Sequence, residues 1–200
     1  MPSNKWLQPT VAVALLYATT KYCTGAHIGT DKGGSFVSPN MHYVVIIAPT
    51  AMPGSSAVSL RVVDVRKQSV LFYSHAGGRD IDVLWSPSSD EVAINSYEAN
   101  SGDFANIFRT TGKSPTRVRK PAYDATEHKL LGKHPEFHEL ERWSFFAKRW
   151  RGKHTLEMIM RGRYYTPRPR HSLETFAFEW TVRFRDRNKF DILKEVPVAY

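Results

Sequence analysis

Histidines and glutamates gather in the middle of the chain, and they are residue types well suited to bind a transition metal. The cluster comprises His128, His134 and His138 with Glu136 and Glu139. His134 and His138 have the i, i+4 spacing that places both imidazoles on one face of a helix. A glutamate directly after the first histidine, as in helical zinc-peptidase motifs, is missing. We interpret the cluster as a surface loop, with a metal site as the alternative, and predict no cofactor.

The motifs that support nucleophilic catalysis are missing from the sequence. It contains no Gly-x-Ser-x-Gly elbow, and Cys23, the single cysteine, has no evident histidine partner. Gly112-Lys113-Ser114 resembles the end of a phosphate-binding loop, but Ile107 stands where that loop requires a glycine, so a hairpin turn is predicted. Three acids on separate predicted strands leave a glycosidase-like pair as an alternative, but we interpret them as solvent-facing strand positions: Asp64, Asp82 and Glu98. The sequence therefore predicts no enzymatic activity.

A basic and aromatic stretch in the last third of the chain is the strongest candidate for binding. Its two prolines, Pro167 and Pro169, forbid ordinary ladder pairing, so we predict an exposed loop. Guanidinium groups bind carboxylate or phosphate in bidentate fashion and stack on rings, which suits an anionic partner. The candidate binding residues are Arg161, Arg163, Tyr164, Tyr165, Arg168 and Arg170. The competing interpretation is a charged sheet edge that discourages pairing between molecules.

Charge separates the two halves of the 200-residue chain. Residues 1–100 carry seven Lys and Arg against seven Asp and Glu, whereas residues 101–200 carry 21 against 12. The net charge of +9 therefore lies entirely in the second half, as expected for a protein with an anionic partner. The length allows one domain with a genuine core, and the single cysteine excludes intramolecular disulfides and multi-cysteine zinc sites.

The first thirty residues leave the cellular location open. Lys5 precedes an apolar run at residues 11–18, and small residues follow at 24–26, which is the order of a secretory signal. The run is too short to span a bilayer, and residues 19–21 interrupt it, so no transmembrane segment is predicted. The segment fits either a signal peptide or a disordered N-terminus, and the protein is either periplasmic or secreted, or cytoplasmic. We expect residues 1–30 to lie outside the folded domain of residues 31–200.

From residue 36 onward, short β-prone runs alternate with turn residues, a pattern typical of antiparallel meanders. The runs fall into three groups at about residues 36–75, 80–120 and 143–197. Residues 125–131, between the second and third groups, predict a short helix or ordered loop. The sequence thus predicts an all-β, mainly antiparallel protein with about three sheets and one short insertion.

A turn motif recurs in these groups. The clearest copy is Trp85-Ser86-Pro87-Ser88-Ser89-Asp90, followed by a hydrophobic strand. Ser38-Pro39-Asn40 begins a weaker copy, and residues 150–156 form a degenerate third. The spacing between Pro39 and Pro87 lies in the range of the repeat period of four-stranded propeller blades. Because tryptophan fills space between sheets and proline fixes φ in a turn, we interpret Trp85, Ser86 and Pro87 as structural residues.

The motif resembles the blade motif of TolB-type, WD-repeat-like β-propellers, over roughly residues 36–196. Ser88-Ser89-Asp90 departs from the aspartate and glycine order of that family. Three blades are also too few to close a ring, since propellers typically need ~4 to 8. The resemblance therefore implies an open or partial propeller of blade-like sheets, or one completed by another chain in an oligomer. In such families the blades are usually scaffolds for protein contacts, and no catalytic residue set is carried over.

Together these patterns predict a non-enzymatic binding or interaction module that contacts a protein or another anionic partner. The alternative is a nucleic-acid-binding protein that uses the Arg-rich C-terminal third, because cations interleaved with aromatic residues suit phosphates and bases.

Overall fold

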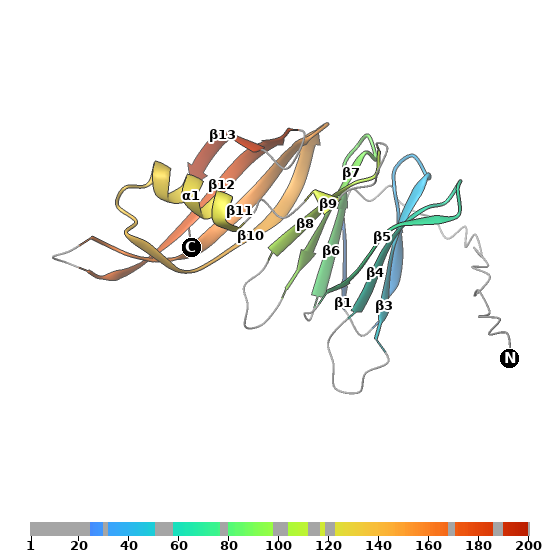
Figure 1. Ribbon diagram of the computed structural model, residues 1–200, viewed down its shortest axis with the longest axis horizontal. Coiled ribbons are helices and arrows are strands. Elements are labelled where there is room, and N and C mark those ends of the chain that lie inside the picture. The colour runs from blue at the N-terminus through green and yellow to red at the C-terminus, as the bar shows by residue number, and fades with distance from the viewer. Residues whose placement is uncertain are drawn as a thin grey trace, which may run out of the picture.

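A computed structural model describes residues 25–29, 32–50, 58–76, 80–97, 104–111, 117–118, 123–167, 171–185 and 190–199. These residues form three antiparallel sheets and one helix, arranged side by side along the long axis of the molecule (Figure 1). The first sheet is a meander of consecutive strands: β2 (Gly34–Val37), β3 (Tyr43–Pro49), β4 (Val58–Asp64) and β5 (Ser69–Ala76). Valine and isoleucine dominate β3 and β4, and their branched side chains suit a pleated surface.

The second sheet follows the order β1-β6-β7-β8, with a short β9 paired to β8. Its strands are β1 (Ala26–Gly29), β6 (Asp80–Trp85), β7 (Glu91–Ser96), β8 (Phe104–Arg109) and β9 (Arg117–Val118). The third sheet comprises β10 (Glu139–Gly152), β11 (Thr155–Tyr165), β12 (Leu173–Phe184) and β13 (Phe190–Pro197). A single parallel residue pair, Phe145 with Phe104, joins the second and third sheets into one continuous hydrogen-bonded path.

The predicted fold class is confirmed. The protein is all-β and antiparallel, with three sheets of four main strands, the short β9 added to the second, and one short helix; the described strands close no barrel or propeller ring. Helix α1 (Tyr123–Lys133) contains the predicted insertion at residues 125–131. It is the one helix of the described residues, and none there is long and apolar enough to cross a membrane.

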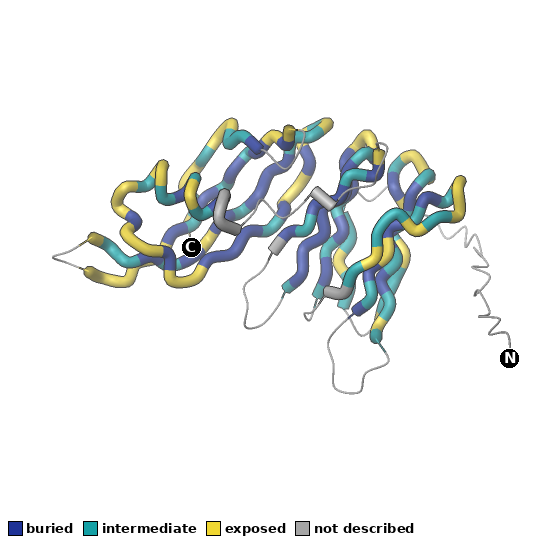
Figure 2. Tube along the Cα trace, viewed as in Figure 1, coloured by how far each residue is buried: buried dark blue, intermediate teal, exposed yellow. Residues whose placement is uncertain are grey.

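The sheets are held together by two hydrophobic cores. The first lies between the first and second sheets and includes Val45, Leu60, Ile81, Trp85 and Ile94. Strand β7 is buried at every position, because sheets cover it on both faces (Figure 2).

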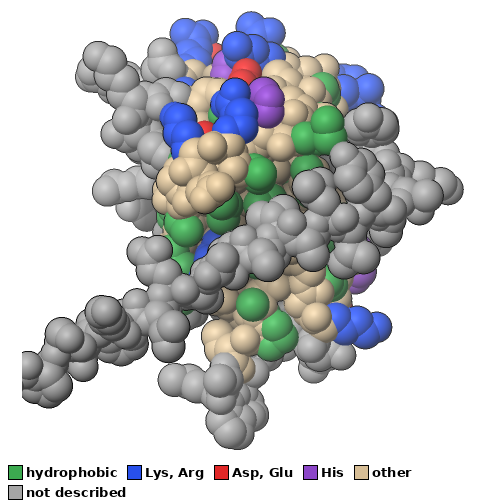
Figure 3. Space-filling model, turned by 90° about the vertical axis from the view of Figure 1, so that its right-hand side faces the viewer, with side chains coloured by type: hydrophobic (Ala, Val, Ile, Leu, Met, Phe, Trp, Pro, Cys, Tyr) green, Lys and Arg blue, Asp and Glu red, His purple; other side chains and the backbone are tan. Residues whose placement is uncertain are grey.

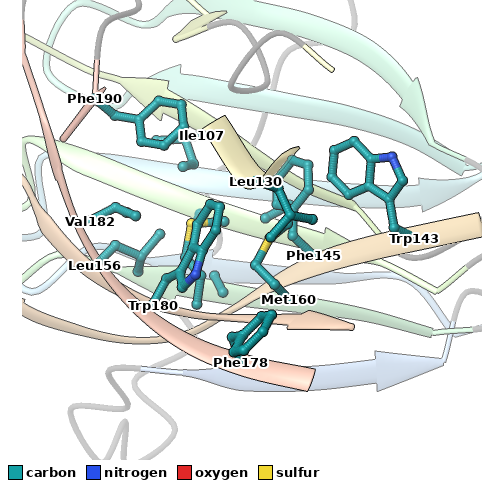
Figure 4. Packing of buried hydrophobic residues seen from close by; sticks show 14 of the residues in the cluster. Ile107, Leu130, Trp143, Phe145, Leu156, Met160, Phe178, Trp180, Val182 and Phe190 are labelled. Atoms are coloured by element: carbon teal, nitrogen blue, oxygen red, sulfur yellow. The ribbon is translucent and has the colours of Figure 1, made fainter. Parts of the chain in front are cut away.

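The second core joins β7 and β8 to the third sheet and to α1. Leu130 of α1 is fully buried against aromatic residues of the third sheet, among them Phe145, Phe178 and Trp180 (Figure 4). Large residues face the core at alternate positions of β12. The residues between them face outward, and the candidate site lies on this outer face of the third sheet.

Two expectations about segment boundaries are wrong. Residues 26–29 belong to the fold, since β1 pairs with β6 from Ala26 with Val83 to Gly29 with Asp80. Residues 161–165 are not loop but the last part of β11, which pairs on both sides with β10 and β12. Residues 1–24 lie outside the described part of the chain.

Candidate functional site

The turns of the first two sheets share one local geometry. In the first, the Ser38 backbone N–H donates to the Tyr43 carbonyl (2.9 Å), and the Tyr43 N–H donates to Ser38 Oγ (3.0 Å). In the second, the same two bonds join Ser86 and Glu91 at 2.8 and 3.0 Å. The residue three positions after each serine has a left-handed backbone, with φ 58° at Met41 and 61° at Ser89. The repeat in the sequence is therefore a repeat of hydrogen-bonded turns.

Tryptophans tie each sheet to the preceding one by an equivalent hydrogen bond. Trp85 Nε1 donates to the Phe36 carbonyl of the first sheet (3.1 Å), and Trp150 Nε1 donates to the Leu84 carbonyl of the second (2.8 Å). Phe36 and Leu84 are separated by the same interval as Pro39 and Pro87, so they are equivalent positions of the repeat. Trp85 is 1% exposed, whereas Pro87 is exposed in the turn that follows. These residues hold the sheets together and present no reactive group.

A further contact between turns joins the second and third sheets. Glu91 is fully buried, and its Oε1 accepts from Arg109 Nη2 at 3.0 Å and lies 2.8 Å from His154 Nδ1. His154 stands in the β10–β11 turn and, like Met41 and Ser89, has a positive φ of 59°. The third copy of the turn motif thus retains the left-handed residue although its sequence is degenerate.

The outward side chains of β10 to β12 form a surface that we call the basic face. It carries more cations than carboxylates: Arg142, Lys148, Arg149, Arg161 and Arg163, with Glu141, Glu157 and Glu179. Bulges in β10 between positions 140 and 142 and between 147 and 149 break its alternation. Because a bulge adds one residue to a strand, Lys148 and Arg149 both reach solvent.

Ion pairs organise the basic face. Glu157 is 4% exposed and lies between Arg149 and Arg151, which both donate to its carboxylate. Burial raises the pKa of Glu157, but the hydrogen bonds from Arg149 and Arg151 outweigh it, so the pKa lies below its ordinary value. Lys148 pairs with Glu179. Arg142 is exposed on the same face.

Aromatic contacts extend the basic face to the second sheet. The Arg161 guanidinium lies over the Phe146 ring, 5.3 Å from its centroid, and Phe146 contacts Tyr97 at 6.4 Å between centroids. The Tyr97 hydroxyl donates to Asp82 Oδ2, and Asp82 Oδ1 lies 2.6 Å from His27 Nδ1. A continuous chain of contacts therefore runs from the third sheet to the second, from Arg161 through Phe146, Tyr97 and Asp82 to His27.

The pair of His27 and Asp82 is held from beneath by Asn95. The Asn95 side chain donates to Asp82 Oδ2 (3.3 Å) and forms two hydrogen bonds with the backbone of Ala147, at 2.9 and 2.8 Å. The hydrogen bond to Asp82 raises the pKa of His27 above its ordinary value, against the opposing effect of desolvation. The sequence did not predict this cluster, because its members lie on three strands that are apart in the chain, β1, β6 and β7. The one signal was the alternation along β6, which places the Asp82 side chain on the face away from the first core.

The structure separates the predicted binding residues. Arg161, Arg163 and Tyr165 face outward on β11, but Tyr164 faces the second core and is 8% exposed, so it cannot offer its ring to a partner. Its hydroxyl donates to Glu174 (2.9 Å), and burial together with that bond raises the pKa of Tyr164 to about 12. The other two predicted residues lie outside the described part of the chain: Arg168 and Arg170.

The histidine cluster is dispersed. His128 and His138 are exposed, whereas the His134 ring stacks between Phe137 (4.8 Å) and Phe178 (4.5 Å). Its Nδ1 lies 2.9 Å from Glu136, and its stacking on Phe178 holds the end of α1 against the third sheet. Within the described ranges, no three metal-binding side chains come together.

The acids considered as a catalytic pair are also apart. Asp64 caps the β4–β5 turn by accepting from the N–H groups of Arg66 (3.0 Å) and Lys67 (3.1 Å) in the first sheet. Asp82 lies in the second sheet with His27, and Glu98 falls outside the described residues.

No protein-family model matches the chain. No curated protein matches it at a significant level either. The basic face and the cluster beside it are therefore interpreted from their geometry alone.

Proposed function

We propose that this protein is a non-enzymatic interaction module that binds an acidic partner protein through the basic face. The observation that carries the proposal is the placement of Arg142, Arg149 and Arg161 on the rigid outer face of a four-stranded sheet, beside Phe146. A regular sheet fixes the spacing of the Cβ atoms from which these side chains extend, so the guanidinium groups are presented together on one face. Arginine is suited to carboxylates because its planar group forms two parallel hydrogen bonds.

The distribution of charge favours a protein partner over a nucleic acid. Glu179 lies among the cations, and the buried Glu157 neutralises part of the charge of Arg149 and Arg151, so the face is not the continuous positive track that a phosphate backbone would follow. Separate carboxylates on a protein can pair with individual arginines. The Phe146 ring is also covered by Arg161, which leaves less of it for base stacking. Nucleic-acid binding is therefore the alternative function, and the observation that favours it is the presence of basic side chains near aromatic rings, which could bind phosphates and bases.

We also propose that the scaffold is a partial β-propeller of the TolB-type, WD-repeat-like kind. The repeat of turns and the two equivalent tryptophan bonds support this proposal. Such an open stack leaves the outer face of the third sheet available for contacts.

Binding to defined probes tests the function. The full chain is titrated into a fluorescent decaglutamate peptide and, separately, into a labelled single-stranded oligonucleotide, at low and at high salt. We expect the peptide to bind at low salt and to dissociate as salt screens the ion pairs. Arg142→Gln with Arg161→Gln should weaken peptide binding at least tenfold. Arg66→Gln with Lys67→Gln is the matched control, because it removes two exposed cations from the first sheet.

Three results would count against the proposal. Equal loss in both double variants would mean that only net charge matters. Binding of the oligonucleotide without the peptide would favour the nucleic-acid alternative, and binding of neither probe would refute the role of the basic face.

A further inference from the structure

Among the residues that the structure describes, the first sheet is covered on one side only. Its inward residues fill the first core, while the outward residues form a row across all four strands, paired in the register Val37, Val44, Val63 and Val70. The next outward row is Ser35, Ile46, Arg61 and Tyr73. Antiparallel sheets with one free face usually place polar residues there. The valine row departs from this rule, whereas the next row follows it at Ser35 and Arg61.

Exposure identifies the surface, which we call the valine face. Val37 is 46% exposed, Val70 is 55% and Tyr73 is 51%. Figure 3 looks onto this end of the molecule and shows hydrophobic side chains on the face, with Lys and Arg side chains along its upper margin. An apolar sheet face exposed in this way marks an interaction surface.

The two ends of the stack of sheets differ, and the difference restricts what can cover the valine face. The far end is the basic face, where a buried Glu157 lies between two arginines. Packing that end against valines would desolvate the charges without new partners, which is unfavourable. Val37 also stands where the second and third sheets carry Trp85 and Trp150, so the first sheet lacks the hydrogen bond that joins one sheet to the next. Head-to-tail stacking of copies of the chain is therefore disfavoured.

We propose that the valine face binds the valine face of a second copy of this chain. The register supports a two-fold axis that runs parallel to the strands, between β3 and β4. That axis sets Val37 opposite Val70 of the other copy, and Val44 opposite Val63. The valine row thus meets itself across its whole width, as a closed isologous interface requires.

The same axis sets Arg61 opposite Ile46 of the other copy and Tyr73 opposite Ser35, so the two copies of Arg61 lie diagonally across the axis, one strand spacing apart. The Arg61 guanidinium already lies over its own Tyr73 ring at 5.6 Å, which leaves its aliphatic stem to pack on Ile46.

The size of the face indicates a reversible dimer. Strands ~4.8 Å apart with a rise of ~3.4 Å per residue make four strands of about seven residues a face of roughly 450 Å². A standard interface buries about 800 Å² per partner, so the valine face is small and we expect a reversible dimer that dissociates on dilution. The dimer carries a basic face at each of its two ends and is therefore bivalent, which goes beyond the proposed function of one chain.

Sedimentation equilibrium of the full chain tests the proposal. The average mass should rise with concentration from 22.8 kDa toward twice that value. Val37→Lys with Val70→Lys should shift the association to at least tenfold higher concentration. Leu193→Lys with Val196→Lys is the matched control on the third sheet, with exposures of 48% and 38%, and should associate like the wild type. Circular dichroism melts of both variants establish that they are folded.

Several outcomes would overturn the proposal. They are a wild-type chain that stays monomeric throughout the concentration range, growth beyond a dimer, and equal dimerisation of the valine-face variant and the wild type. High salt separates this contact from the basic face, because apolar association persists or strengthens in salt while ion pairing weakens.

Discussion

Trp85 offers the sharpest test of how the sheets are joined. The side chain is 1% exposed, stacks on Tyr43 with 6.4 Å between ring centroids, and donates its Nε1 hydrogen to the Phe36 carbonyl at 3.1 Å. Trp85→Ala removes the ring and the hydrogen bond together, whereas Trp85→Phe keeps most of the apolar volume and removes the bond. The two variants therefore separate the packing contribution from the polar one.

The magnitudes follow from burial. Trp85→Ala leaves a cavity between two sheets and should lower the free energy of unfolding by about 3–5 kcal/mol. Trp85→Phe should lower it by about 1–2 kcal/mol, since one net hydrogen bond contributes about 1 kcal/mol and the smaller ring fills the site less well. For a chain of this size each kcal/mol corresponds to about 2–4 °C in Tm, so Trp85→Ala should melt about 6–20 °C below the wild type.

Urea unfolding followed by far-ultraviolet circular dichroism measures these differences, with a thermal melt as the second observable. Leu193→Ala serves as the control, because that side chain is 48% exposed on the third sheet and its loss should change stability by less than about 0.5 kcal/mol. An unchanged midpoint for Trp85→Ala would refute the reasoning. Equal losses for the Ala and Phe variants would mean that the hydrogen bond, and not the packing, dominates.

Two other features of the fold predict measurable effects. Asp82 raises the pKa of His27, so this pair stabilises the fold fully below the unfolded-state pKa of about 6.5 and progressively less as pH rises through the folded-state pKa. His27→Gln should therefore lower the free energy of unfolding more at acidic than at alkaline pH. A loss of stability that does not change with pH would contradict this. Gly162→Ala should lower the free energy of unfolding by about 1–3 kcal/mol, because a Cβ there would stand 2.8 Å from the Trp143 Cα of β10. In Gly132→Ala the added Cβ meets nothing within 4 Å, so this variant should be neutral or slightly stabilising. The midpoints of urea unfolding compare the two variants.

Local patterns in the sequence were sufficient for the fold class. The alternation along residues 172–184 and the turn motif at Trp85-Ser86-Pro87 involve neighbours in the chain, and such short-range preferences can be recognised without coordinates. They predicted the antiparallel sheets and the helical insertion. They did not predict β1, which is too short to carry much signal and becomes a strand only by pairing with β6, a segment far away in the chain.

The binding surface depended on information that the sequence does not hold locally. Pro167 and Pro169 suggested a loop from residue 161 onward, but a proline removes only its own N–H from a ladder, so β11 continues to Tyr165. The bulges of β10 then decide which of its side chains face outward, and they arise from pairing with β11.

Composition and local pattern by themselves determined that this protein is a β-rich, basic chain with a repeated turn. Only the tertiary structure decided which cations share a face, that Tyr164 is buried, and that His27, Asp82 and Tyr97 meet. The physical reason is that side-chain alternation and turn chemistry act between adjacent residues, whereas the coverage of each sheet face depends on contacts between strands far apart in the chain.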